Sequence, residues 1–161
     1  MSLSHFDSKG QAVMVDVSGK EPTLRTAVAE AKVVLRPETL SDIFEGRMTK
    51  GDVLGVARLA GIASAKRTPE LIPLSHPVAI HHAAIDFATD PPNGVIVVTA
   101  TVRAFERTGV EMEAMVAAAV TALTIYDMCK SADRSIAIRE ISLLYKEGGK
   151  SGVYKRGGTG T

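Results

Sequence analysis

The chain has 161 residues, of which 45% are hydrophobic and 4% aromatic, and its formal net charge at pH 7 is +1. A chain of this length and apolar content can bury a substantial core, which excludes general disorder and favours a single domain over residues 1–161. The balanced charge and the lack of tryptophan argue against a nucleic-acid-binding surface, so we expect no nucleic-acid partner.

Cysteine content and hydropathy indicate the cellular setting. The single cysteine, Cys129, excludes an internal disulfide and a cysteine-based zinc site. No apolar run reaches the ~18 residues that a membrane span needs, and the N-terminus has no charged-then-apolar signal pattern. We expect a cytoplasmic protein without membrane contact, with flexible segments at about residues 1–12 and 153–161, where there is little to bury.

The first half of the chain predicts one strand and two helices. Residues Leu24 to Leu35 favour a strand, because alanine and valine recur there at every second position. Pro37 then opens a short helix that ends near Gly46. The second helix, Asp52 to Lys66, is dense in glycine and alanine, which lets it approach a neighbour closely, and Asp52 is its expected N-cap.

The second half predicts two strands, a long helix and a last strand. The strands Val78 to Thr89 and Val95 to Arg107 are joined by a Pro-Pro-Asn-Gly turn. The helix Thr108 to Lys130 and the strand Ser135 to Tyr145 follow. This order favours the α+β class and a ferredoxin-like βαββαβ sandwich, with an antiparallel sheet and helices packed on one face. Self-association would cover the other face of that sheet.

The helix from Thr108 to Lys130 carries charged side chains on a strongly apolar background. Because a buried charge is costly unless it is paired, this pattern indicates the wall of a polar site. At ~100° per residue, Glu113 and Asp127 lie within about 40° of each other, with Lys130 on one flank of the same face. Glu111 points elsewhere, and with Thr108 it matches a capping box, so it either caps the helix or belongs to the site.

The separation of two of these carboxylates predicts an oligomer. Glu113 and Asp127 are fourteen residues apart, which is roughly 21 Å along a helix axis. They cannot both contact one small substrate from the same helix. Either they serve different ends of the helix or two copies of the chain contribute parts of one site, and we expect the second. Asp127 and Lys130 are i,i+3 neighbours and are also compatible with a plain surface ion pair.

Two loops outside this helix carry candidate site residues. Lys50 precedes the start of the second helix, where the helix dipole disfavours a cation, so either a bound anion relieves it or it is a solvated surface lysine. His76 lies in a stiff loop between Pro73 and Pro77. A rigidly held histidine suits proton transfer or phosphate binding, and a structural role is the alternative.

The segment Lys146 to Gly152, KEGGKSG, invites comparison with a phosphate-binding loop. It is not a Walker motif, because Leu144 occupies the position of the first glycine and no helix follows. Its glycines and lysines can still offer N–H groups and positive charge to an anion. A flexible tail is the competing interpretation.

These segments together resemble the molybdenum cofactor biosynthesis protein C (MoaC) family, the cyclic pyranopterin monophosphate synthases. The resemblance runs in chain order over nearly the whole sequence, and the ordered set is specific although each piece alone is weak. The matching pieces are MVDVS (14–18), KGDV (50–53), AGI and AKRT (60–62 and 65–68), LIPLSHP (71–77), TGVEMEA (108–114), LTIYDMCK (123–130) and GGKSG (148–152).

The resemblance implies a fold, an assembly and an activity. Members of the family have a ferredoxin-like fold and form homohexamers, trimers of dimers with sites at subunit interfaces. They are lyases that convert a GTP-derived cyclic nucleotide, 3′,8-cyclo-7,8-dihydro-GTP, into cyclic pyranopterin monophosphate with release of diphosphate, and a radical SAM enzyme supplies the substrate. We expect the same of this chain, with no cofactor and no metal.

The resemblance also assigns site residues. The family's catalytic aspartate falls on Asp127, and the lysines linked to the site fall on Lys50, Lys130 and Lys146; we expect Lys50 and Lys130 to be catalytic together with Asp127. Many relatives carry cysteine where this chain has Ser75, so a hydroxyl would make the contact to the substrate here. The substrate-binding positions fall on Leu74, Ser75, His76, Met112 and Glu113, with Arg25 as a further candidate for phosphate contact.

The expected roles follow from charge and hydrogen-bonding capacity. We expect Asp127 and Lys130 to act as an acid/base couple and Glu113 to accept N–H bonds from the base. Cations must neutralise the triphosphate, a role expected of Lys50, Lys146, His76 and Arg25. The alternatives are a non-catalytic nucleotide- or pterin-sensing domain, a purely structural subunit and, more weakly, a metal hydrolase, since no two ligands show metal-site spacing.

Overall fold

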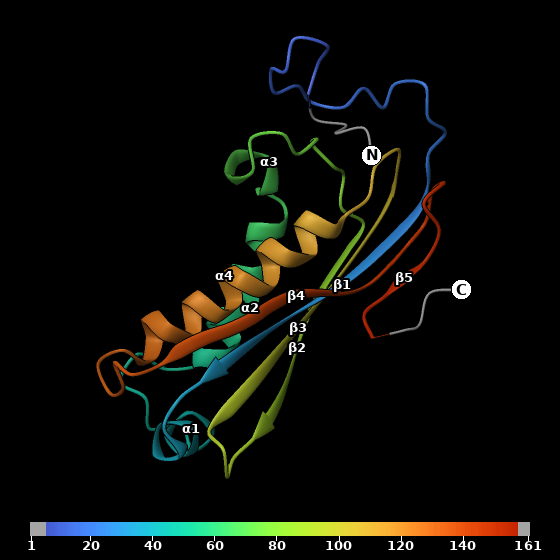
Figure 1. Cartoon of the computed structure of the whole chain (residues 1–161). Helices are drawn as coiled ribbons and strands as arrows, with labels where there is room; N and C mark the ends of the chain where they lie inside the picture. The colour runs from blue at the N-terminus through green and yellow to red at the C-terminus, as the bar shows by residue number, and fades with distance from the viewer. Residues whose placement is uncertain (1–5, 158–161) are drawn as a thin grey trace.

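The computed structural model describes residues 6–157, in which five strands form one antiparallel sheet and the helices lie against it (Figure 1). The strand order is β2-β3-β1-β4-β5, so the connections from β1 to β2 and from β3 to β4 each pass over one strand. The strands are β1 (Thr23–Val34), β2 (His82–Asp90), β3 (Val95–Glu106), β4 (Ala137–Glu147) and β5 (Tyr154–Lys155). The predicted α+β class is confirmed.

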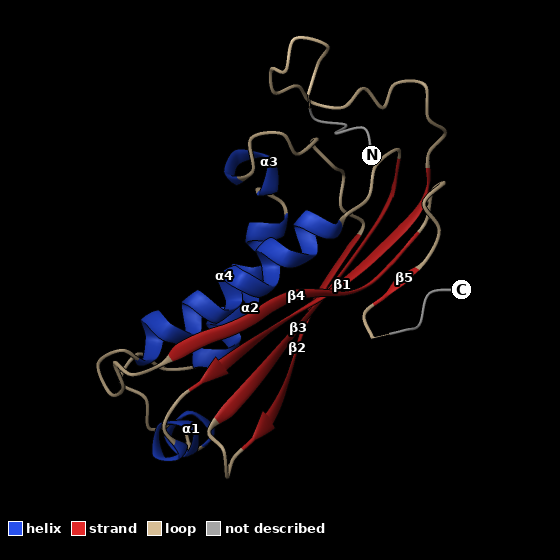
Figure 2. Ribbon diagram, viewed as in Figure 1, coloured by secondary structure: helices blue, strands red, loops and turns tan. Residues whose placement is uncertain are grey.

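Two helices form the layer that covers one face of the sheet. These are α2 (Val53–Ala65) and α4 (Glu111–Cys129), which pack against each other and against the strands (Figure 2). The short helices α1 (Pro37–Phe44) and α3 (Thr68–Leu71) lie near opposite ends of the sheet. Because α4 has 19 residues and is therefore roughly 28 Å long, its two ends lie far apart on the molecule.

Alternation along β1 explains why the helices lie on this face. Ala27, Ala29 and Val33 are fully buried, as the period of two predicts. The register places Ala27 opposite Val102 and Ala29 opposite Ala100 of β3, so small side chains form the surface beneath α4. A low surface of this kind lets the helix approach the sheet closely.

The close approach of α2 to α4 depends on Gly61. A Cβ at this position would overlap Thr121 Oγ1 and would lie 3.1 Å from the backbone oxygen of Ala117. No larger residue fits without moving α4 away. The prediction that small residues in this helix serve close packing is therefore confirmed.

Most predicted elements match the structure to within a few residues, but some differ. The strand predicted from Val78 begins only at His82, and neither α3 nor β5 was expected. The short strand β5 lies in a segment predicted to be flexible, and it pairs with Tyr145 and Lys146 of β4. Of the predicted flexible ends, residues 1–5 and 158–161 lie outside the described residues.

The predicted capping box at the start of α4 is wrong, whereas the predicted cap of α2 is right. The N-cap of α4 is Val110, which makes no side-chain capping bond, so Thr108 lies two positions too early. Glu111 therefore occupies the first helical position, and its carboxylate turns toward Lys146. In α2, Asp52 accepts the backbone N–H of Gly55 at 2.8 Å.

Helix α4 is long and apolar enough to cross a membrane by length and composition, with a mean hydropathy of 1.3. Charged residues interrupt its apolar sequence, which is why no uninterrupted apolar run of ~18 residues was found in the sequence. In the fold, 56% of this span is buried, against α2 and the sheet. It is a core helix.

Candidate active site

The C-terminal end of α4 carries an exposed ionic cluster. Lys130 Nζ donates to Asp127 Oδ1 at 2.6 Å. Lys50 Nζ, from the loop between α1 and α2, donates to Asp127 Oδ2 at 3.1 Å and to its backbone oxygen at 2.8 Å. The two lysines predicted to be catalytic thus both contact Asp127, although Lys50 and Asp127 are 77 positions apart in the chain.

Two lysines on one carboxylate determine the electrostatics of this cluster. Hydrogen bonds from Lys130 and Lys50 lower the pKa of Asp127, and Asp127 in turn raises the pKa of Lys130. The three side chains are 41–55% exposed, so the cluster is open to a ligand. One anion between two cations leaves a net positive charge, which suits an anionic substrate and supplies groups that can give and take protons.

A buried aspartate anchors the loop that follows this end of α4. Asp133 accepts the backbone N–H of Arg36 at 2.9 Å and both the N–H and the hydroxyl of Ser135 at 2.9 and 2.6 Å. Burial alone would raise the pKa of Asp133, but these hydrogen bonds lower it to about 2. The loop after Lys130 is thereby tied to the start of α1.

The N-terminal end of α4 borders a cavity of about 400 Å³, here called the inner cavity. All five residues predicted to bind the substrate line it, two from α4 and three from the loop after α3. They are Leu74, Ser75, His76, Met112 and Glu113, and the remaining wall consists of Val15, Val17, Lys20, Val78, Thr108, Gly109 and Glu111. The stiff loop around His76 therefore faces α4.

Glu113 is the most unusual group in the inner cavity. It is only 2% exposed, and its Oε1 has no hydrogen-bond partner within residues 6–157. Burial raises the pKa of Glu113 to about 7, and the neighbouring Glu111 adds to the rise. A buried carboxyl with a free oxygen on a cavity wall is available to a ligand N–H or O–H. Glu111 lines the same cavity, although its carboxylate pairs with Lys146.

The segment before β1 closes one side of the inner cavity. His76 Nε2 donates to the backbone oxygen of Val15 at 2.6 Å, and Arg107 Nη1 donates to that of Ser18 at 2.9 Å. The Asp16 carboxylate accepts the N–H of Ser18 at 2.8 Å, which lowers the pKa of Asp16. His76 thus lines the inner cavity and also fixes the position of Val15 in its wall.

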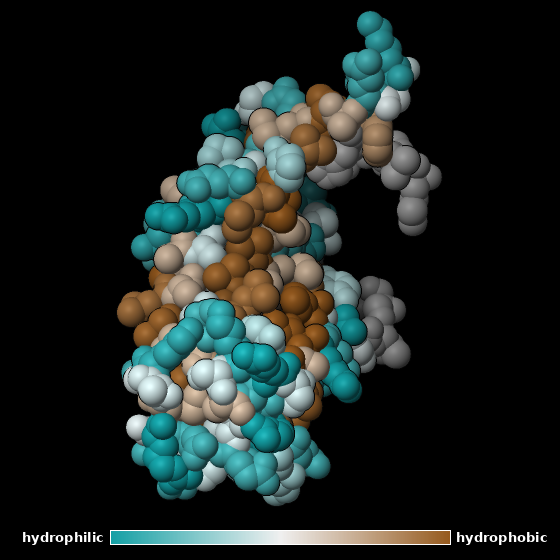
Figure 3. Space-filling model, turned by 90° about the vertical axis from the view of Figure 1, so that its left-hand side faces the viewer, coloured by the Kyte–Doolittle hydropathy of each residue, from teal (hydrophilic) through white to brown (hydrophobic). Residues whose placement is uncertain are grey.

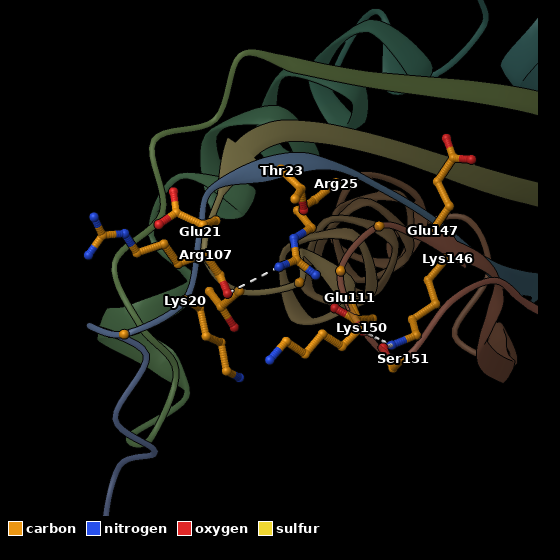
Figure 4. Close-up of a pocket in the computed structure, with 15 residues that line it drawn as sticks. Lys20, Glu21, Thr23, Arg25, Arg107, Glu111, Lys146, Glu147, Lys150 and Ser151 are labelled. Atoms are coloured by element: carbon orange, nitrogen blue, oxygen red, sulfur yellow. Dashed lines mark hydrogen bonds and ion pairs between the residues drawn. The ribbon is translucent and has the colours of Figure 1, made fainter.

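Figure 4 shows a second cavity of about 610 Å³, here called the cationic cavity. Arg25 of β1 and Lys146 of β4, which we expect to contact phosphate, both line it. Lys20, Arg107 and Lys150 line it as well, so five cationic side chains border one space, together with the three acidic residues Glu21, Glu111 and Glu147.

Lys146 is already paired inside the cationic cavity. Its Nζ lies 3.1 Å from Glu111 Oε1 and donates to Ser151 Oγ at 2.8 Å. Glu111, left open between a cap and a site residue, is therefore a wall residue that holds a lysine. Both cavities share Lys20, Thr108, Gly109 and Glu111 in their walls, so they adjoin at the first turn of α4.

Sequence reasoning missed several wall residues. Lys20 and Arg107 carried no motif, and the pattern around Glu111 favoured a cap that does not form. The only sequence signal of Lys20 and Arg107 is that Lys20 precedes one predicted strand and Arg107 ends another, which many surface residues also do. Within one chain, moreover, Lys50 lies with Asp127 and away from the group of Arg25, His76 and Lys146.

The described residues contain no group of three or more His, Cys, Asp or Glu side chains that could hold a metal ion. What they do contain is a free buried carboxyl beside a cluster of cations, and a lysine–aspartate–lysine cluster at the far end of the same helix. This arrangement defines an α+β protein whose site suits a small molecule that is anionic at one end and carries hydrogen-bonding groups at the other.

Comparison with known proteins identifies the family. The sequence model of the MoaC family matches residues 14–149, and the chain belongs to this family. It is 77% identical over 156 residues to the cyclic pyranopterin monophosphate synthase of Geotalea uraniireducens, covering 97% of this chain and 98% of that protein. The corresponding enzyme of Geobacter sulfurreducens is 71% identical with the same coverage. That of Chloroflexus aurantiacus is 52% identical over 154 residues, covering 96% of this chain and 94% of the relative.

Proposed function

We propose that this protein is a cyclic pyranopterin monophosphate synthase, a lyase of molybdenum cofactor biosynthesis. Its substrate is 3′,8-cyclo-7,8-dihydro-GTP, and its products are cyclic pyranopterin monophosphate and diphosphate. Family membership over residues 14–149 supports the reaction. The observation that carries the site is the free, buried carboxyl of Glu113 next to a cavity bordered by five cations.

The two cavities fit the two halves of this substrate. In the inner cavity, Glu113 accepts N–H bonds from the guanine-derived ring, with Leu74, Ser75 and Met112 around it. In the cationic cavity, Arg25 and Lys146 neutralise the triphosphate. His76, at the inner wall, contributes to phosphate binding, and Lys146 exchanges Glu111 for a phosphate oxygen when the substrate binds.

Catalysis belongs to the cluster at the other end of α4. The reaction opens and rebuilds rings and closes a cyclic phosphate as diphosphate leaves, so protons must move at several positions. Asp127, Lys130 and Lys50 supply one carboxylate and two ammonium groups, each of which lies within hydrogen-bond distance of that carboxylate. Lys50 can also steady the negative charge on the departing diphosphate, the phosphate role predicted for it.

The two ends of α4 join in one site when copies of the chain associate. We propose the homohexamer of the family, a trimer of dimers, with sites at subunit interfaces. A helix of roughly 28 Å cannot serve one small substrate with both ends, which supports a shared site. The helical side of the molecule also exposes hydrophobic side chains (Figure 3), among them Val56, Leu59 and Leu123, which a second copy would cover.

Two finer assignments belong to the same proposal. The strand order β2-β3-β1-β4, with helices in both crossovers, favours the ferredoxin-like class, with β5 as an added edge strand. Molybdenum cofactor biosynthesis from a GTP-derived precursor favours a cytoplasmic location.

Incubation with the cyclic dihydro-GTP intermediate tests the reaction. We expect equimolar pyranopterin and diphosphate, detected as the oxidised fluorescent pterin and by a coupled diphosphate assay. The substrate should stay intact in a matched incubation with Asp127→Asn. If the wild-type protein binds this intermediate without consuming it, the result would contradict the proposed reaction and favour the nucleotide-sensing alternative.

Subunit complementation tests the shared site. The variants His76→Ala and Asp127→Asn are each expected to be inactive, because each lacks one half of the site. After unfolding and refolding together in equal amounts, about one quarter of the sites would combine an intact His76 with an intact Asp127 from another copy. Recovery of about a quarter of wild-type activity supports the interface, and a mixture as inactive as its parents overturns it.

A further inference from the structure

Arg25 is a buried cation without an acidic partner. It is only 8% exposed, and no carboxylate of the described chain lies within 4 Å of its guanidinium. Its Nε donates to the backbone oxygen of Glu106 and its Nη2 to that of Arg107, both at 3.1 Å. These acceptors hold the group in position but do not neutralise it, so its charge remains available to the cationic cavity that it lines (Figure 4).

The turn after β4 closes the remaining side of this guanidinium. Gly149 has φ of +71°, and a Cβ there would overlap Arg25 Nη1 and lie 2.6 Å from Cζ. A Cβ on Gly148 would lie 2.9 Å from Arg25 Cδ. The guanidinium therefore lies between the carbonyl groups at the end of β3 and a turn whose backbone it approaches without an intervening side chain.

We infer that Gly149 is a positioning residue for substrate binding: its missing side chain allows Arg25 to lie in the wall of the cationic cavity with its charge toward the ligand. The inference rests on the proposed function only in taking Arg25 as a phosphate contact. Any side chain at position 149 would displace the Arg25 guanidinium from the Glu106 and Arg107 carbonyl groups and weaken binding of the triphosphate.

The chain offers a matched control for the backbone. Gly152 lies in the same turn region with φ of +66°, but a Cβ there would meet no atom within 4 Å. Gly152 lines neither cavity. Alanine at either position must adopt a positive φ, so the two variants bear a similar backbone strain and only Gly149→Ala disturbs Arg25.

Steady-state kinetics with the cyclic dihydro-GTP substrate separate the two effects. We expect Gly149→Ala to raise KM about tenfold, the loss of one charge-assisted hydrogen bond, with kcat within about twofold of wild type. The inhibition constant of inorganic tripolyphosphate, which has the phosphates without the ring, should rise by the same factor. Gly152→Ala should leave both constants unchanged, and an equal rise in KM for both variants would overturn the inference.

The double variant tests whether Gly149 acts through Arg25. Arg25→Ala should raise KM, and adding Gly149→Ala should raise it no further, because the overlap has been removed. An added rise in KM in the Arg25→Ala background overturns the inference, as does a Gly149→Ala variant that equals wild type while Arg25→Ala is impaired. If Gly149→Ala equals wild type while Arg25→Ala is impaired, the phosphate role of Arg25 stands and only the role of Gly149 is lost. A wild-type KM for Arg25→Ala would instead remove the phosphate role of Arg25.

Folding supplies the test if Gly149→Ala alone yields no folded protein. The Arg25→Ala/Gly149→Ala protein should then fold, because the guanidinium that overlaps the new methyl group is gone. Recovery of the wild-type circular dichroism spectrum in the double variant supports the inference, and a double variant that stays unfolded overturns it.

Discussion

At the N-terminal end of α4, Glu113 is 2% exposed and has an oxygen without a partner, whereas at the C-terminal end the Asp127 side chain is 55% exposed and pairs with two lysines. On the helical wheel the two carboxylates lie within about 40° of each other. What separates them is the surroundings: the loop around His76 covers one end, while the other end opens to solvent.

The consequence is opposite pKa shifts on one helix. Burial raises the pKa of Glu113 to about 7, and the hydrogen bonds from Lys130 and Lys50 lower the pKa of Asp127. Near neutral pH, Glu113 can therefore gain or lose a proton as a ligand arrives, while Asp127 remains an anion that organises two ammonium groups. Binding is assigned to the first end and proton transfer to the second.

The largest effect is expected from Asp127→Asn. The amide keeps the shape of the side chain but removes the anion that holds both lysines, so kcat should fall about 10³-fold. KM should change little, because the binding end is untouched. Steady-state assays measure both constants, and a solution mass checks that the assembly is intact.

Asp86→Asn is the control for Asp127→Asn, since it removes an exposed carboxylate of β2 that has no hydrogen bond or ion pair within residues 6–157. It should retain wild-type turnover. Full activity of Asp127→Asn would remove the catalytic role from the exposed end of the helix.

The next effect concerns stability at the buried end, tested by Glu113→Gln. Near pH 4 the carboxyl is protonated in folded and unfolded chains alike. As the pH rises from 4.5 to about 7 the unfolded chain loses its proton first, so wild-type stability falls through this window and the loss is complete above it. At pH 8 the variant should be more stable by on the order of 3 kcal/mol, the equivalent of this pKa rise.

Denaturant unfolding at pH 4.5 and pH 8 measures this difference. Glu70→Gln, which removes an exposed carboxylate of α3, serves as the control and should not show a gain confined to high pH. If Glu113→Gln has the same stability as wild type at pH 8, Glu113 is not held in an unfavourable ionised state, and the contrast between the two ends of α4 disappears.

The core was predictable because its signals are local. The alternation through Ala27, Ala29 and Val33 specifies which face of β1 is buried, and Asp52 caps the helix next to it in sequence. The small residues around Gly61 indicated close helix packing before any partner was known. Each of these inferences depends on neighbours within a few positions.

The site was predictable only in part, because its pairings are long-range. The family resemblance predicted site roles for Asp127, Lys50 and Glu113. No spacing rule joins Glu111 to Lys146 or His76 to the carbonyl group of Val15. The capping-box pattern even favoured the wrong role for Glu111, since the backbone enters the helix two residues later than the pattern requires.

A matched lysine pair sharpens the comparison, with a smaller effect. Lys130 contacts Asp127 at 2.6 Å and Lys146 contacts Glu111 at 3.1 Å, so each is paired with a carboxylate of α4. Lys130→Ala should lower kcat about 10²-fold with a nearly constant KM. Lys146→Ala should raise KM about tenfold with a nearly constant kcat. If the two variants show the same pattern of kcat and KM, the division between binding and catalysis is wrong.

The smallest effect is expected from Asp52→Ala, which removes the cap of α2 two residues after Lys50. Loss of the bond to the N–H of Gly55 should lower stability by about 1 kcal/mol, or the melting temperature by roughly 2–4 °C. The loop that carries Lys50 would loosen at the catalytic end, so kcat should fall by about twofold while KM stays constant. Asp90→Ala is the control, because it loses its bonds to Asn93 in the β2–β3 turn without touching either end of α4. A rise in KM rather than a fall in kcat for Asp52→Ala would mean that Lys50 serves binding, and that the exposed end of α4 is not purely catalytic.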